Sequence, residues 1–155
     1  MKIIDKNITH MGKDLIEPFN PDFVTPNGYD LSIKEVEIDD HVVEFGKEDI
    51  AIPAKTFFRV MTREKIKMPS DMIGELWLRS TYARKGIQAT FGLVDAGFMG
   101  TLALSLYNAS KKPFVIGKDE KPTVCQIVFE KLSEVPERTY AKRSGNYQNQ
   151  ETLKK

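Results

Sequence analysis

The pattern of apolar and polar positions is most regular between residues 101 and 108, where the sequence reads TLALSLYN. Successive side chains of a strand point to opposite faces, so the three leucines of this stretch would share one buried face. The other face would carry the small and polar side chains of Thr101, Ala103, Ser105 and Tyr107. We therefore predict a strand with one face in the core and the other lining a cavity.

Similar strand-like segments recur at short spacing, with no long helical period and no internal repeat. We predict strands at residues 28–33, 41–45, 50–61, 75–80 and 123–132. Residues 80–86 are predicted to form a helical turn, with Ser80 as its N-cap and Gly86 as its terminator. This pattern predicts an all-β barrel or sandwich with one or two short helices.

The segment 50–61 shows both a strand pattern and a strand breaker. Its apolar side chains fall at alternate positions, and Lys55 and Arg59 lie on the opposite face. Pro53 cannot donate a backbone hydrogen bond, which indicates an edge position. We predict one edge strand over the whole segment.

Just before the alternating strand, three glycines at positions 92, 97 and 100 bracket Leu93, Val94 and Asp95. Glycine allows tight turns and the close approach of a ligand to the backbone. A hairpin that offers backbone N–H and C=O groups to a flat ring is one interpretation. An ordinary hairpin with a turn aspartate is the other, and these residues alone leave both open.

A second candidate site lies at residues 79–84, which read RSTYAR. A helix N-terminus presents unpaired N–H groups, and Arg79 could bind phosphate oxygens in pairs. Arg84 follows Ser80 by four residues and would return to the same face. The alternative is a capped surface helix with solvated arginines.

Composition limits the classes of function. The net charge of +1 gives no general field to attract nucleic acid or an anionic membrane. A single cysteine, Cys125, excludes an internal disulfide and suits a reducing compartment. The two histidines have no cluster of other ligands around them, which argues against zinc. The polar start and the lack of a membrane-spanning apolar run favour a cytoplasmic protein.

Several segments resemble the dUTPases and the related dCTP deaminases, in family order. Residues 28–31 (GYDL) resemble the first dUTPase motif, and residues 92–100 (GLVDAGFMG) resemble the third. Residues 78–86 (LRSTYARKG) are similar to a deaminase segment. Gln126 lies in a strand-like segment, as a Gln does in the fourth dUTPase motif, and residues 146–150 resemble the deaminase lid. The resemblance implies a distorted β-barrel or jelly-roll of the trimeric dUTPase type. It also implies a barrel at residues 1–135 and a lid at residues 136–155.

The resemblance also implies roles for individual residues. Asp30 would hold a Mg²⁺ ion through water, although its bare sequence context also fits a strand-edge carboxylate that bonds local backbone. Phe98 would stack under the deoxyribose. The triphosphate would be held by Arg79, Ser80, Thr81 and Arg84. The rest of the nucleotide would meet Leu93, Val94, Asp95, Gly100, Ala103, Ser105, Gln126, Tyr140, Tyr147 and Gln150. The family implies a homotrimer with sites between subunits.

One departure from the family pattern decides the predicted reaction. Deaminases of this fold carry a proton-transferring Glu where this chain has Ser105, whereas the dUTPase aspartate is present as Asp95. We therefore predict a dUTP diphosphatase in which Asp95 activates water, helped by Ser80 and Arg84. Two alternatives remain. One is a dCTP deaminase, with or without dUTPase activity, that recruits another carboxylate such as Glu75, and the other is a non-catalytic nucleotide-binding module.

Overall fold

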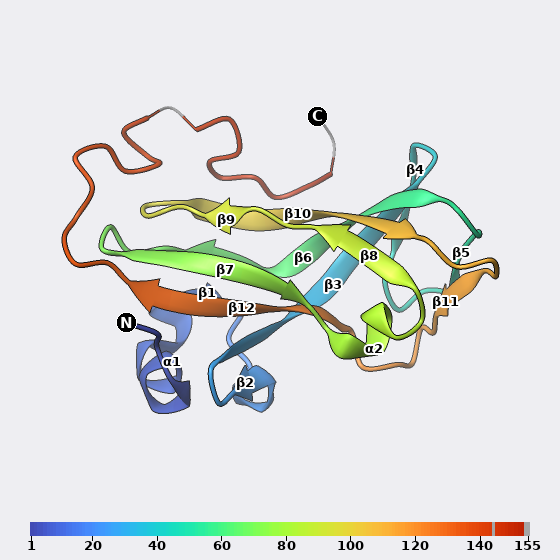
Figure 1. Ribbon diagram of the computed structural model, residues 1–155, viewed down its shortest axis with the longest axis horizontal. Helices are drawn as coiled ribbons and strands as arrows, with labels where there is room; N and C mark the ends of the chain where they lie inside the picture. Colours follow the sequence, from blue (N-terminus) through green and yellow to red (C-terminus); the bar gives the residue numbers. More distant parts are fainter. Residues whose placement is uncertain (144, 154–155) are drawn as a thin grey trace.

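The computed structural model describes residues 1–143 and 145–153, and Figure 1 shows a curled antiparallel sheet as its main feature. The sheet has ten strands, and its longest path runs in the order β8-β10-β6-β3-β12-β7-β9. β1 pairs with β6, while β2 and β4 pair with β3; β5 and β11 form a separate pair. The helices are α1 (Asp5–Met11) and α2 (Ser80–Ala83), with 3-10 turns at Gly12–Asp14 and Pro21–Phe23. The strands are β1 (Ile16–Glu17), β2 (Val24–Thr25), β3 (Gly28–Ile38), β4 (His41–Glu44), β5 (Ile50–Ile52), β6 (Phe57–Lys67), β7 (Met72–Leu78), β8 (Ile87–Thr90), β9 (Leu93–Val94), β10 (Met99–Asn108), β11 (Phe114–Ile116) and β12 (Thr123–Lys131).

The alternating segment forms β10, which pairs with β6 on one side and β8 on the other. Leu104 and Leu106 are 2% and 1% exposed, while Ala103 and Tyr107 on the opposite face are exposed. Burying one leucine side chain stabilises a fold by about 1.5–3 kcal/mol, which favours this register over one shifted by a residue. The predicted division into a core face and an open face therefore holds from Ala103 to Tyr107, whereas at the start of β10, where the register shifts, Thr101 is buried and Leu102 lines a cavity.

The predicted strand at residues 50–61 is wrong as a single element. β5 ends at Ile52, β6 begins at Phe57, and the two belong to different sheets. The break follows from Pro53, which lacks an N–H group, and from Lys55, whose φ of 59° is left-handed. The alternation on either side of the break holds, because Ile50, Ile52, Phe58 and Val60 are all buried.

The helical turn is shorter and capped differently than predicted. α2 has four residues, and Arg79 occupies the N-cap position, where no side chain caps the helix. Ser80 is the first helical residue rather than the cap. Gly86 ends the turn with a φ of 84°, which is the predicted terminator conformation. None of the helices in the described residues is long and apolar enough to cross a membrane.

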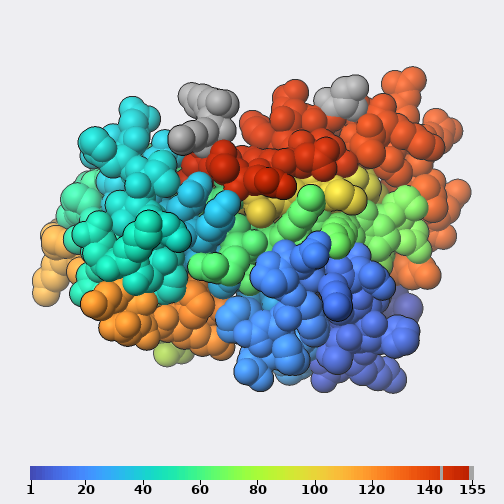
Figure 2. Space-filling view, turned by 180° about the vertical axis from the view of Figure 1, so that it is seen from behind, coloured from blue at the N-terminus to red at the C-terminus, as the bar shows by residue number. Residues whose placement is uncertain are grey.

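The described part of the C-terminal segment lies over the β9–β10 hairpin, as Figure 2 shows from behind. The N–H of Asn149 donates to the carbonyl of Met99 at 2.6 Å, and the N–H of Thr101 donates to the carbonyl of Gln150 at 2.8 Å. Leu153 is only 3% exposed, and its N–H donates to Oε1 of Glu35 at 3.1 Å. The segment is therefore held both by backbone pairing and by a buried side chain.

Candidate functional site

A cavity of about 770 Å³ lies between the β9–β10 hairpin and the C-terminal segment. Binding cavities for small organic ligands span roughly 300–1,000 Å³, so its size suits a nucleotide-sized molecule. We call it the hairpin cavity. It is lined by Arg59, Leu76, Gly92, Leu93, Val94, Asp95, Phe98, Thr101, Leu102, Ala103, Ser105, Tyr140, Arg143, Gly145, Asn146, Tyr147 and Gln150.

The hairpin is anchored on one side and turns tightly at its tip. Val94 and Leu93 of β9 pair with β7, and the N–H of Phe98 donates to the carbonyl of Asp95 at 3.1 Å. Gly97 closes this turn with a φ of 81°, and a Cβ there would approach the Cβ of Thr139 to 2.9 Å. The turn therefore requires glycine, both for its conformation and for the contact with the C-terminal segment. It leaves the Asp95 side chain exposed on the cavity wall.

The C-terminal segment occupies backbone groups that were predicted to recognise a base. The N–H of Met99 donates to Oε1 of Gln148 at 3.0 Å, and the N–H of Thr101 donates to the carbonyl of Gln150 at 2.8 Å. The Tyr140 ring meets Phe98 edge-on, with 5.3 Å between ring centroids. An edge-on ring pair stabilises a fold by about 0.5–1.5 kcal/mol beyond the contribution of the surface area that the rings bury. The predicted residues Tyr140, Tyr147 and Gln150 therefore lie at the hairpin of their own chain.

Several residues predicted to meet the sugar or the base, and some that were not predicted, line the hairpin cavity. The predicted residues are Leu93, Val94, Asp95, Phe98, Ala103 and Ser105. Arg59 and Arg143 also line it, although they were not predicted as site residues. For Arg59 a signal existed, because a charged residue faced away from the apolar side of its strand. Glu75 does not line the cavity, and its carboxylate instead pairs with Lys2 at 2.8 Å.

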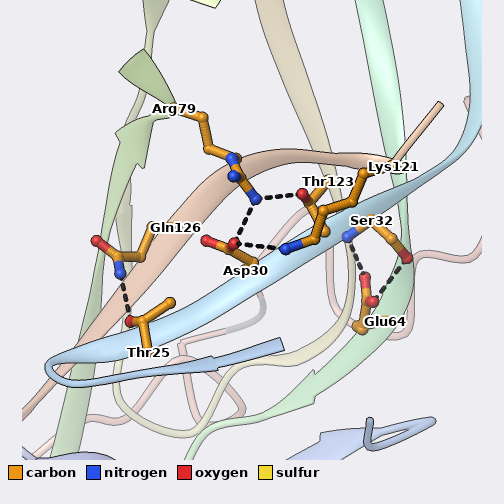
Figure 3. A network of polar contacts seen from close by, with 8 residues as sticks. All are labelled: Thr25, Asp30, Ser32, Glu64, Arg79, Lys121, Thr123 and Gln126. Carbon is orange, nitrogen blue, oxygen red and sulfur yellow. Dashed lines mark hydrogen bonds and ion pairs between the residues drawn. The ribbon is translucent and has the colours of Figure 1, made fainter. Parts of the chain in front are cut away.

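A second polar group lies where α2, β3 and β12 meet, and Figure 3 shows it from close by. One terminal nitrogen of Arg79 donates to both Oδ2 of Asp30 and the hydroxyl of Thr123. Lys121 approaches the same carboxylate oxygen to 3.8 Å. We call these four residues the Arg79–Asp30 cluster.

Asp30 is 7% exposed, so its carboxylate depends on the surrounding cations. Burial raises its pKa above the usual range, and the positive charges of Arg79 and Lys121 oppose that shift. Of the two interpretations of Asp30, bonding to local backbone is not what the structure shows. The carboxylate instead forms an ion pair with a residue that is distant in sequence.

The other residues predicted for the triphosphate lie near this cluster and away from the hairpin cavity. Ser80, Thr81 and Arg84 are exposed on α2 and just after it, and none of them lines the cavity. The side-chain amide of Gln126 donates to the hydroxyl of Thr25 in the same region (Figure 3). Figure 1 places α2 and the tip of the β9–β10 hairpin at opposite ends of the sheet. The predicted site therefore falls into two separate regions of one chain.

The residues around Asp30 do not form a complete magnesium site by themselves. In residues 1–143 and 145–153, no group of three or more His, Cys, Asp or Glu side chains is placed to hold a metal ion. Mg²⁺ prefers an octahedron of oxygen atoms, often completed by substrate phosphates. Asp30 offers one carboxylate, and Arg79 and Lys121 already surround it with positive charge. The predicted role of Asp30 toward magnesium stays a prediction.

A family model described as dCTP deaminase-like matches residues 2–132 of the chain. A dCTP deaminase of Pyrococcus horikoshii is 38% identical over 141 residues, which cover 90% of this chain and 87% of the relative. A dCTP deaminase of Thermococcus gammatolerans is also 38% identical, over 136 residues, which cover 86% of this chain and 83% of the relative. The chain therefore belongs to the dCTP deaminase-like family.

Solved structures support the same fold. The 2'-deoxycytidine 5'-triphosphate deaminase of Agrobacterium tumefaciens superimposes with a TM-score of 0.70 at 19% identity, over 83% of this chain. This chain spans 48% of the length of that protein. The dUTPase of EIAV superimposes with a TM-score of 0.50 at 20% identity, over 69% of this chain and 90% of the neighbour. The predicted all-β fold of the dUTPase type is confirmed.

The predicted dUTP diphosphatase activity is contradicted. Relatives that are 36–38% identical over most of the chain are named dCTP deaminases, and the matching family is dCTP deaminase-like. The prediction gave decisive weight to a single position, Ser105. Similarity along the entire barrel outweighs that position, and it favours the alternative that was kept beside the main prediction.

Proposed function

We propose that this protein is a dCTP deaminase, which converts dCTP and water to dUTP and ammonia. The observation that carries the proposal is the identity of 38% with a protein named dCTP deaminase, over 90% of the chain. The size and aromatic walls of the hairpin cavity support a flat heterocycle as its occupant.

Deamination requires a group that moves protons at the amino-bearing carbon of the base. Among the described residues, Asp95 is the only carboxylate that lines the hairpin cavity. In the proposed reaction its carboxylate accepts a proton from the water whose oxygen bonds to C4 of cytosine. That proton is then passed to the amino group, which departs as ammonia, and the second proton of the water moves to N3 as the C4 carbonyl forms. The Ser105 hydroxyl provides a hydrogen bond on the cavity face of β10.

We further propose that the site is completed between copies of the chain in a homotrimer. The separation between the hairpin cavity and the Arg79–Asp30 cluster supports this, because a triphosphate bound near Arg79 and a base bound in the cavity require both regions. A mixing experiment tests it. Asp95→Asn and Arg79→Met variants, each inactive alone, should regain activity after co-refolding. Continued inactivity of the mixture, with both variants folded, would contradict shared sites.

The test of the reaction is direct. The full chain is incubated separately with dCTP and with dUTP, and ammonia, pyrophosphate and the nucleotide products are measured. We expect ammonia from dCTP in amounts equal to the dCTP consumed, whether dUTP accumulates or is converted further. Pyrophosphate from dUTP without ammonia from dCTP would overturn the proposal, as would binding of dCTP without any product.

A further inference from the structure

A row of polar side chains crosses three neighbouring strands beneath the hairpin cavity. Glu37 of β3 is in register with Arg59 of β6, and Arg59 is in register with Ser105 of β10. Residues paired directly across antiparallel strands lie on the same face, with Cβ atoms about 4.5–5.5 Å apart. The register therefore places a cation next to Ser105, on the face that lines the cavity, and Arg59 and Ser105 both belong to the lining.

Glu37 holds this cation in place. Nε of Arg59 donates to Oε2 of Glu37 at 2.5 Å, and a terminal nitrogen of Arg59 contacts the same oxygen. The side chains of Arg59 and Glu37 are 26% and 13% exposed. A guanidinium has five N–H donors in one plane, so these two contacts leave several donors for a ligand. A partly buried, held arginine is prepared to bind acceptors in a fixed geometry.

The surroundings of Arg59 favour a base over a phosphate as its ligand. The walls of the cavity include the aromatic rings of Phe98, Tyr140 and Tyr147, which suit a flat ring. Cytosine carries two adjacent acceptors, O2 and N3, and a guanidinium offers two parallel donors at matching spacing. Uracil carries a hydrogen at N3. Its N3–H group would therefore face an arginine N–H group, and two donors cannot form a hydrogen bond.

We propose that Arg59, positioned by Glu37, binds the O2 and N3 edge of cytosine and selects the substrate over its deaminated product. This inference rests on the proposed function, from which it takes a cytosine nucleotide as the ligand. It adds a specificity residue that senses the change deamination makes at N3, where an acceptor becomes a donor. The discrimination arises because a polar site rejects a partner that leaves its donors unmatched.

Affinity is measured by calorimetry with dCTP, dUTP and 3-deaza-dCTP, in which a C–H group replaces N3. All chains carry Asp95→Asn to prevent turnover. Arg59→Leu should weaken dCTP binding about tenfold to a hundredfold, because a charged hydrogen-bond pair is lost. Binding of dUTP and of 3-deaza-dCTP should change less than threefold. Arg63→Leu, which removes an exposed arginine from the same strand, is the matched control and should change none of the three.

Two further variants keep the test independent of folding. Arg59→Lys retains the charge but not the paired donors, so it should also lose the preference for dCTP. Glu37→Gln loosens the guanidinium and should give a smaller loss for dCTP alone. Thermal midpoints show that each variant is folded.

Equal weakening of dCTP and dUTP would overturn the inference, because it would indicate a phosphate contact. A loss of less than threefold for dCTP would overturn it as well. Failure of the proposed function is distinguishable, since binding is measured without turnover. If the protein releases no ammonia yet Arg59→Leu weakens dCTP selectively, the function fails and the inference stands.

Discussion

The Arg79–Asp30 cluster and the hairpin cavity hold their charged groups in opposite ways. In the cluster, the nearly buried carboxylate of Asp30 pairs with Arg79 and Lys121, and Arg79 also donates to the hydroxyl of Thr123. In the cavity, Asp95, Arg59 and Arg143 border an open volume of about 770 Å³. The first arrangement stabilises the fold of a single chain, whereas the second leaves side chains facing a space that a ligand can enter.

This difference shows how one residue of a sequence motif can also take part in an ion pair that the motif does not reveal. The residues that resemble a phosphate-binding segment include Arg79, yet its guanidinium already has protein partners. A phosphate would have to share or displace these partners, at the cost of exposing the charge of Asp30.

The variant Asp95→Asn removes the only carboxylate that lines the cavity in the described residues. We expect the rate of ammonia release from dCTP to fall about a hundredfold to ten-thousandfold, as for loss of a general base. Initial rates measured at saturating dCTP check this. The exposed Asp119 provides a control, since Asp119→Asn should keep the parent rate. A rate within a few-fold of the parent in Asp95→Asn would remove Asp95 from the chemistry.

Truncation after Leu132 removes the cover of the cavity. The chain loses the buried Leu153 and the contact between Tyr140 and Phe98, so unfolding should cost about 2–4 kcal/mol less. Turnover should fall by more than the decrease in the fraction of folded protein, because the cavity would then be open to water. Urea denaturation and ammonia release measure the two effects, with Leu153→Ala as a partial version. Unchanged turnover in the truncated chain would contradict a role for the segment in catalysis.

Arg79→Met tests whether the cluster is held together mainly by its own ion pair. Leaving the Asp30 carboxylate without its arginine should lower the free energy of unfolding by about 1–3 kcal/mol. Asp30→Asn in the same chain should recover part of this loss, because the stranded charge is then absent. Urea denaturation of the two single variants and the double variant completes the cycle, with the exposed Lys111→Met as a control. Simple addition of the two losses would show that the pair contributes nothing to stability.

Glu64 differs from Asp30 because its buried carboxyl group is held by a serine and not by cations. It is 2% exposed and accepts hydrogen bonds from the N–H and the hydroxyl of Ser32, at 2.8 and 2.7 Å (Figure 3). Burial raises its pKa above the usual range, although the bonds from Ser32 oppose the shift. Since the folded state favours the protonated acid, its stabilising contribution is complete below the unfolded pKa and is lost as pH rises through the folded pKa.

Glu64→Gln should therefore gain stability relative to the parent as pH rises above about 4.5, by at most about 1.4 kcal/mol per pH unit. Denaturation midpoints from pH 4 to pH 8 check this. A parent that instead gains stability over the variant with rising pH would contradict the raised pKa.

Much of the barrel was predictable because its signals are local. Alternation of side chains over β10 needs no distant partner to be recognised, and burial of Leu104 and Leu106 agrees with it. The glycine-bracketed turn around Asp95 was equally visible, because a φ of 81° at Gly97 is a backbone demand that glycine meets. The break between β5 and β6 was missed because the alternation continues across it in sequence, although the backbone turns at Lys55.

What sequence alone determined about this protein was its class of fold, the faces of its strands and the hairpin that carries Asp95. Tertiary structure decided which charged residues meet. The pairing of Arg79 with Asp30 spans 49 positions, and the row of Glu37, Arg59 and Ser105 depends on the register of three strands. Local spacing cannot specify such contacts, because they arise from the alignment of strands that are distant in the chain. Strand alignment also places the residues of the predicted nucleotide site in two separate regions. No single segment of the sequence could reveal that separation.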